Sequence, residues 1–95
     1  MIKAIVMKPA DNVATVMEDV IPGTKIVIFV GDAKKTIDIS EKIAFAHKFA
    51  VENIPKGAAI KKYGEVIGIA TQDIKAGQHV HVHNIESTRG RGDKE

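Results

Sequence analysis

The sequence predicts a compact, mainly β domain with one short helix. Three segments of the 95-residue chain repeat one pattern, in which an acidic or amide residue and a β-branched residue are followed by a glycine and a β-rich run. These segments are DVIPGTKIVIFV, NIPKGAAIKK and DIKAGQHVHV. The pattern is typical of a turn that leads into a strand, and a chain of this length fits a single small domain.

The one helix is expected over residues 11–19. Asp11 or Asn12 can cap its first turn, and apolar residues then recur at helical spacing. The Pro-Gly pair at positions 22–23 would end it.

The next elements are expected to be strands. Residues 25–30, KIVIFV, are apolar and β-branched with a glycine on either side, which predicts a buried strand. Residues 36–39 alternate polar and apolar, as a shorter strand does. In the segment SEKIAFAHKFAVEN, by contrast, the alanines and the apolar spacing favour a helix by local propensity.

Gly23, Gly57 and Gly77 occupy the same place in the three repeats, and we expect each to supply the positive φ that its turn requires. The domain is expected to span residues 1–85. The polar segment 86–95 is expected to be a flexible tail.

Composition argues against several classes of function. The chain has no cysteine, which excludes disulfides and thiolate sites. A net charge of +2, with scattered Lys and Arg and only three Phe and one Tyr, argues against a nucleic-acid partner. No apolar run is long enough for a membrane span, and the N-terminus lacks the apolar core of a signal peptide. We therefore expect a cytoplasmic protein with neither nucleic-acid nor membrane partners.

The densest cluster of chemically active side chains is QDIKAGQHVHVHN, in which three histidines alternate with Val80 and Val82. On a strand, alternate residues share a face, so the valines would face the core and the imidazoles would face away from it. Neighbouring histidines would lie about 6.6 Å apart, close enough for two, but not all three, to bind one ion. Two interpretations stay open: a His-x-His pair completed by another chain, and a polar or interface surface without metal.

Two smaller clusters carry titratable side chains. His47 and Lys48 lie between apolar residues, a pattern that also suits an exposed basic pair on an amphipathic segment. Tyr63 and Gly64 end an apolar, basic run and by themselves indicate only a turn. The sequence has no nucleophile–base–acid triad, phosphate-binding glycine loop or paired-carboxylate site, so it is poorly equipped for independent catalysis.

The order of the clusters resembles a known family. The segments KPADNVATVMEDVIPGT and AHKFAVENIPKGAAIKKYGEVIGIATQDIKAGQHVHVHN resemble the N-terminal SAF domain of altronate and galactarate dehydratases, and equally the small subunit of sulfolactate sulfo-lyases. The resemblance implies a β-clip fold, in which residues 47–51 form a strand rather than part of a helix. It also implies sugar-acid dehydration with a divalent metal, Fe²⁺ or Mn²⁺, as cofactor.

The same resemblance implies a small subunit of a split hydro-lyase, which acts on a small sugar acid together with a separate large catalytic subunit. A homo-oligomer is also compatible with the sequence. Other interpretations are the small subunit of a sulfolactate sulfo-lyase, a non-catalytic module that binds sugar acids, and an assembly domain whose histidines pack against a partner.

The resemblance also indicates candidate site residues. The candidate catalytic residues are His47 and His83, and the candidate metal ligands are His79 and His81. The candidate substrate-binding residues are Asp11, Asn12, Lys48, Tyr63, Gly64 and Asn84. Among them, Lys48 would suit a substrate carboxylate, and Tyr63 and Asn84 would suit its hydroxyls.

Two positions depart from the family pattern. Lys8 stands where members commonly have a histidine before the first proline, which puts any metal or substrate role at this position in doubt. Ala46 stands where they commonly have glycine, and a positive φ costs alanine more than glycine.

Overall fold

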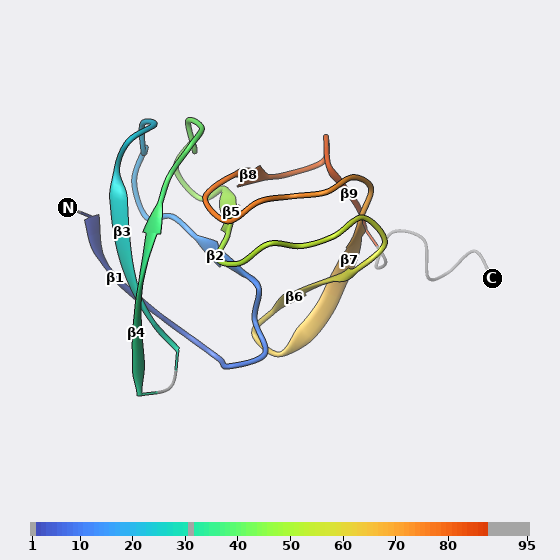
Figure 1. Cartoon of the computed structure of the whole chain (residues 1–95), viewed down its shortest axis with the longest axis horizontal. Coiled ribbons are helices and arrows are strands. Elements are labelled where there is room, and N and C mark those ends of the chain that lie inside the picture. The colour runs from blue at the N-terminus through green and yellow to red at the C-terminus, as the bar shows by residue number, and fades with distance from the viewer. Residues whose placement is uncertain (1, 31, 88–95) are drawn as a thin grey trace.

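The computed structural model describes residues 2–30 and 32–87, and every regular element within these ranges is a β-strand. The strands are β1 (Ile2–Met7), β2 (Val13–Thr15), β3 (Lys25–Val30), β4 (Ala33–Asp38), β5 (Lys48–Ala50), β6 (Ala59–Lys62), β7 (Glu65–Ala70), β8 (His79–Val80) and β9 (Ile85–Ser87). They form three-stranded sheets ordered β1-β3-β4, β2-β5-β8 and β6-β7-β9. Figure 1 shows the first and third sheets on either side of the second. The predicted mainly β fold is confirmed.

The first sheet confirms both strands expected after the first repeat. The run KIVIFV is β3, and it buries Ile26 and Ile28 completely. It pairs antiparallel with β4 and parallel with β1. Strand β4 begins three residues before the predicted start at Thr36 and ends at Asp38.

The helix predicted over residues 11–19 is wrong. Residues 13–15 form β2, which pairs antiparallel with β5. The side chain of Asn12 caps no helix, because its Nδ2 donates to the carbonyl of Ala59 at 2.9 Å and its Oδ1 accepts from the amide of Lys61 at 2.8 Å. The amide of Val16 donates across to the carbonyl of His47 at 2.9 Å. Pairing with distant strands thus satisfies backbone groups that a helix would have satisfied locally.

The central sheet separates two hydrophobic cores. Ala14 and Phe49 pack into one core, whereas Val13, Ala50 and Val80 pack into the other. This arrangement follows from the alternation of side chains along paired strands, since Ala14 is the register partner of Phe49 and Val13 that of Ala50. The strand that the family resemblance implied around His47 is therefore β5, the middle strand of a sheet that is buried on both faces.

The chain has four turns of the same kind, rather than the three seen in the sequence, and these turns lie together in two pairs. Gly23, Gly57 and Gly77 have φ values of 91°, 90° and 92°, which confirms the predicted positive φ. Ala46 has a φ of 72° and forms the fourth turn of the same kind. Each turn follows a bridging aliphatic residue, and these residues form isolated antiparallel bridges in pairs, Val20 with Ile43 and Ile54 with Ile74.

In each of the three repeats, the polar residue at the start accepts a hydrogen bond from the other turn of the same bridged pair. Asp19 Oδ1 accepts the amide of Phe45 at 2.7 Å. The equivalent carbonyl of Asn53 accepts the amide of Ala76 at 3.0 Å, and the carboxylate of Asp73 accepts the amide of Lys56 at 2.8 Å. In the fourth case the cap is absent because residue 42 is a lysine and the amide that it would cap belongs to a proline, residue 22, which has no N–H.

The segment expected as a tail begins within a strand. Glu86 and Ser87 belong to β9 and are the register partners of Ile69 and Gly68. The rest of that segment, residues 88–95, lies outside the described residues. The part of the chain that the structure describes contains no helix long and apolar enough to cross a membrane.

Candidate functional site

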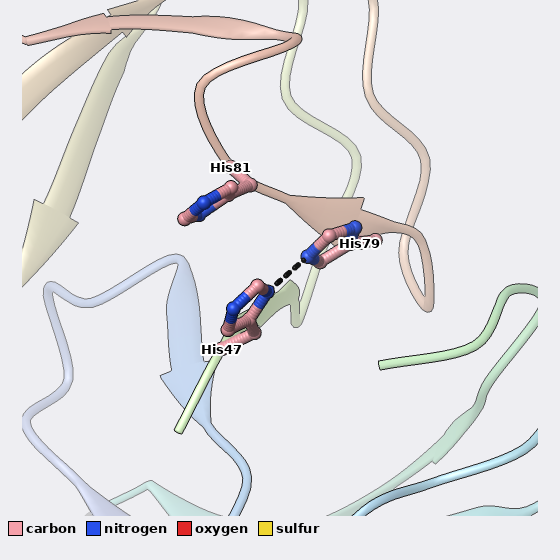
Figure 2. A group of neighbouring side chains, drawn as sticks. All are labelled: His47, His79 and His81. Carbon is pink, nitrogen blue, oxygen red and sulfur yellow. Dashed lines mark hydrogen bonds between the residues drawn. The ribbon is translucent and has the colours of Figure 1, made fainter. Parts of the chain in front are cut away.

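Three histidines from two neighbouring strands form one group. Strands β5 and β8 pair antiparallel, with Phe49 opposite His79, and one further step in this register places His47 opposite His81. The ring centroids of His47 and His81 are 4.3 Å apart, and His47 Nδ1 lies 2.9 Å from His79 Nε2 (Figure 2). One ring nitrogen from each of the three histidines lies within 4.8 Å of the other two. We call His47, His79 and His81 the imidazole group.

A turn ends β8 after Val80, so the side chains that follow do not alternate between two faces as the sequence predicted. Asn84 closes this turn, because its Oδ1 accepts the amide of His81 at 3.0 Å and its Nδ2 donates to the carbonyl of His79 at 2.8 Å. Val80 is buried as predicted, but Val82 is 79% exposed, so the prediction that both valines face the core is wrong. His83 stays outside the imidazole group, although its ring centroid lies 5.2 Å from that of His79.

The electrostatics of the imidazole group suit a metal ligand set, which must be neutral. Burial lowers the pKa of His79, and the nearby His47, His83 and His81 lower it further, while Glu41 opposes the shift. Burial also lowers the pKa of His81, with further contributions from His47, Lys48 and His83. Both rings are therefore mainly neutral at pH 7.

The spacing of two nitrogens in the group is compatible with a shared divalent ion. Metal–nitrogen bonds of roughly 2.0–2.1 Å place two ligand nitrogens about 2.9–3.4 Å apart in octahedral or tetrahedral coordination. The distance of 2.9 Å between His47 Nδ1 and His79 Nε2, which form a hydrogen bond in the metal-free group, lies in this range, and a ring nitrogen of His81 lies within 4.8 Å of a ring nitrogen of each. Imidazole ligands suit iron or zinc better than manganese, which prefers oxygen ligands.

Lys48 adds a partly buried positive charge beside the imidazole group. Its register partner on β8 is Val80, the residue next to His81. Burial lowers the pKa of Lys48, and the charge of Lys62 lowers it further. Within the described residues no carboxylate forms an ion pair with Lys48. The ammonium of Lys62 lies 5.1 Å from the ring centroid of Tyr63.

Three predicted substrate-binding side chains already make hydrogen bonds within the chain. The buried carboxylate of Asp11 accepts the amides of Tyr63 at 2.9 Å and Gly64 at 2.8 Å, which holds the β6–β7 turn. The side chains of Asn12 and Asn84 are buried and bonded to main-chain groups, as described above. The ring of Tyr63 is 66% exposed. Contacts between these residues and a substrate remain predictions.

Sequence reasoning missed Glu41 and the pocket that it forms with other polar residues on the other side of His79. Glu41 Oε1 accepts the amide of His79 at 2.8 Å. A pocket of about 100 Å³ is lined by Glu41, Gln72, Asp73, Gln78, His83 and Asn84. All of them except Glu41 belong to the motif QDIKAGQHVHVHN, and Glu41 joins them through a loop contact in which the amide of Ser40 donates to the carbonyl of Gly77 at 3.0 Å.

Comparison with known proteins identifies a family whose sequences this chain matches. The sequence model of the altronate/galactarate dehydratase SAF domain matches residues 2–88. Altronate dehydratase of Escherichia coli (strain K12) is 43% identical over 77 residues, which are 81% of this chain and 15% of that enzyme. The altronate dehydratase of Bacillus subtilis (strain 168) is 35% identical over 77 residues and is covered to the same extent.

A second kind of relative is much shorter. The (2R)-sulfolactate sulfo-lyase subunit alpha of Chromohalobacter salexigens is 33% identical over 76 residues, which are 78% of this chain and 81% of that subunit. The chain thus spans a small part of the altronate dehydratases and most of the sulfo-lyase subunit.

Proposed function

This chain belongs to the altronate/galactarate dehydratase SAF domain family, and we propose that it is the small subunit of a carbon–oxygen lyase that dehydrates a sugar acid. In this proposal a separate large subunit completes the active site. The observation that carries the proposal is the imidazole group near the ammonium of Lys48, which has no anionic partner among the residues that the structure describes. The names of the relatives supply the class of reaction.

Dehydration of a sugar acid makes three demands on a site. A base removes the proton from the carbon next to the carboxylate, while hydroxide leaves the following carbon. The resulting enol becomes a 2-oxo acid. The site must therefore anchor the carboxylate, move a proton, and stabilise the negative charge that develops as the proton leaves.

The described residues offer a group for each demand. Lys48 would anchor a carboxylate, because its partly buried ammonium has no anionic partner within the described part of the chain. The imidazole group would hold a divalent ion such as Fe²⁺, which when bound supplies Lewis-acid stabilisation of the developing charge. His47 would then serve as a ligand, and the exposed His83 is left as the candidate for moving a proton.

The surroundings of the imidazole group suit cover by a larger partner. Met17 and Phe45 are 59% and 60% exposed. Met17 follows Val16, whose amide donates to the carbonyl of His47, and Phe45 lies two residues before His47 in the chain. Three protein ligands leave coordination positions open for a substrate or for side chains of a large subunit. The subunit organisation named for the sulfo-lyase relative supports the same arrangement.

Sulfolactate cleavage is the second candidate function, because the chain covers 81% of a sulfo-lyase subunit alpha. The chemistry differs only in the leaving group. The proton next to the carboxylate is removed in the same way, and sulfite leaves in place of hydroxide.

Co-expression of the full chain with a large dehydratase subunit from the same genome tests the proposal. We expect 2-oxo acid formation from altronate or galactarate only when both subunits are present; sulfite release from sulfolactate would favour the second candidate. Lys48→Ala and His83→Ala should lower kcat/KM at least 100-fold. The matched control is Lys25→Ala, which removes a lysine that pairs with Asp38 in an exposed ion pair. Wild-type rates in both site variants would refute the assigned roles.

Metal binding is tested on the isolated chain. We expect about one equivalent of Fe²⁺ or Zn²⁺ to bind and to raise the Tm, and His79→Ala and His81→Ala to abolish this shift. Ligand binding without any effect of a large subunit would instead indicate a sugar-acid binding module. Tight subunit association with unchanged turnover in the histidine variants would indicate an assembly domain.

A further inference from the structure

Opposite charges flank the imidazole group. On one side, the charge of Lys48 lies close enough to His81 to act on it, and Lys62 adds a second positive charge near Lys48. On the other side, the carboxylate of Glu41 bonds to the amide of His79 at 2.8 Å. Asp73 lines the same pocket as Glu41. A ligand at the imidazole group would thus meet a basic surface at one end and an acidic pocket at the other.

The size of this pocket matches a short piece of a hydroxylated chain. Its volume is about 100 Å³. Since one water molecule takes up about 30 Å³ in the liquid, the pocket accommodates roughly three water-sized groups. It also contains His83, whose ring lies beside His79, so the pocket borders the imidazole group directly.

The polar groups in the pocket suit hydroxyls. The Nε2 of Gln72 donates to the carbonyl of His83 at 3.2 Å, which leaves Gln72 Oε1 available as an acceptor. The Oε1 of Gln78 accepts the amide of Lys75 at 2.7 Å, which leaves Gln78 Nε2 available as a donor. Hydroxyls both donate and accept, so they can use amides and carboxylates together. A second anionic group would be repelled by Glu41 and Asp73.

We propose that the pocket formed by Glu41, Gln72, Asp73, Gln78 and His83 is a hydroxyl-binding subsite. Together with Lys48, it selects acids that have one anionic end and a hydroxylated chain, the aldonates, over diacids and sulfo-acids. This selection rests on the proposed function, because it takes the imidazole group as the reaction centre. Binding of a sugar acid in the pocket is measurable without the reaction.

The first test is a titration of the isolated full chain, followed by NMR, with one equivalent of Zn²⁺ as a diamagnetic ion. Altronate is expected to shift the side-chain amide signals of Gln72 and Gln78. Galactarate, with its second carboxylate, should bind about tenfold more weakly, since two nearby carboxylates repel it through partly screened charge. Equal or tighter binding of galactarate, or amide signals that do not move at saturation, would overturn the subsite.

Charge-neutralising variants make the test specific. Glu41→Gln combined with Asp73→Asn keeps a carbonyl acceptor for the amides of His79 and Lys56 and removes both charges. The preference for altronate over galactarate should then fall to about twofold or less. Asp19→Asn is the matched control, because Asp19 caps the equivalent turn at Phe45 but does not line the pocket. It should leave the preference unchanged.

The second test uses the reconstituted enzyme. The subsite predicts a higher kcat/KM for altronate than for galactarate or sulfolactate. A higher value for either dianion would overturn the selection while leaving the lyase function intact. Altronate binding by the isolated chain, with no elimination of any acid by the complex, would refute the proposed function and leave the subsite standing.

Discussion

Ala46 and Gly57 occupy equivalent positions in two of the four turns, and both have a left-handed backbone, with φ values of 72° and 90°. Ala46 directly precedes His47, whereas Gly57 lies in the other pair of turns, next to Ala58. The two positions therefore allow the cost of a Cβ atom in this turn to be measured with and without a neighbouring site residue.

Ala46→Gly should stabilise the protein by up to about 1 kcal/mol. A left-handed backbone costs alanine roughly 1–2 kcal/mol, of which the greater freedom of glycine in the unfolded chain offsets about 0.4–1 kcal/mol. Gly57→Ala should destabilise the protein by about 1 kcal/mol through the backbone alone, because no atom lies within 4 Å of the added Cβ. Urea denaturation of both variants checks this. A less stable Ala46→Gly protein would contradict the explanation.

Thr15→Val should also stabilise the protein, by about 1 kcal/mol. The Thr15 hydroxyl is buried and has no hydrogen-bond partner among the described residues. An unpaired buried hydroxyl costs about 1–3 kcal/mol, and valine has nearly the same shape without the polar atom. The control is Thr36→Val on the exposed face of β4, which should change the unfolding free energy by less than about 0.5 kcal/mol. Destabilisation by Thr15→Val would show that the hydroxyl has a partner.

The stability of the metal-free protein should fall as the pH drops through the histidine range. The pKa values of His79 and His81 are lowered in the folded state, so the unfolded chain binds protons first as the pH falls below about 6.5. Thermal unfolding in EDTA between pH 7.5 and 5.5 should therefore show a decreasing Tm. The slope should shrink in the double variant His79→Gln/His81→Gln. A Tm that rises toward pH 5.5 would contradict the direction of both shifts.

Asp11→Ala should destabilise the protein by about 2–3 kcal/mol, because it leaves the amides of Tyr63 and Gly64 without their acceptor. Asp11→Asn keeps one carbonyl oxygen and should cost less. Chemical denaturation measures both effects, with the exposed Glu18→Ala as control. If Asp11→Asn were fully stable yet inactive in the reconstituted enzyme, Asp11 would be a substrate ligand rather than a structural residue.

The sequence alone predicted those elements whose local pattern and long-range pairing agree. Strand β3 is β-branched, apolar and bounded by glycines, and three turns carry the glycine that their φ requires. Residues 11–19 were mistaken for a helix because their apolar spacing suits a helix as well as a strand, and only pairing with β5 decides between them. The fourth turn was not identified as a repeat because it holds alanine in place of glycine, although the family resemblance marked Ala46 as a position where glycine is common.

The sequence predicted only part of the candidate site, because the rest depends on pairing between distant segments. The alternation of histidines in QDIKAGQHVHVHN marks His79 and His81 as neighbours, but the register of β5 against β8 is what adds His47. Glu41 carries no sequence signal, since it lies 38 positions before His79 and meets it through a loop contact. The side chain of Asn84 ends β8 early, an effect that a simple strand pattern does not include.

Strand β5 sends Phe49 into one core and Ala50 into the other. Any shift of this strand would open voids on both sides at once, so it is a poor place for the molecule to flex. Adjustment to a docking protein or to a new substrate must therefore come from the connections around it, those that carry Glu41, Gln72 and His83. Laboratory evolution of substrate preference should accordingly collect its changes in these connections and leave β5 untouched.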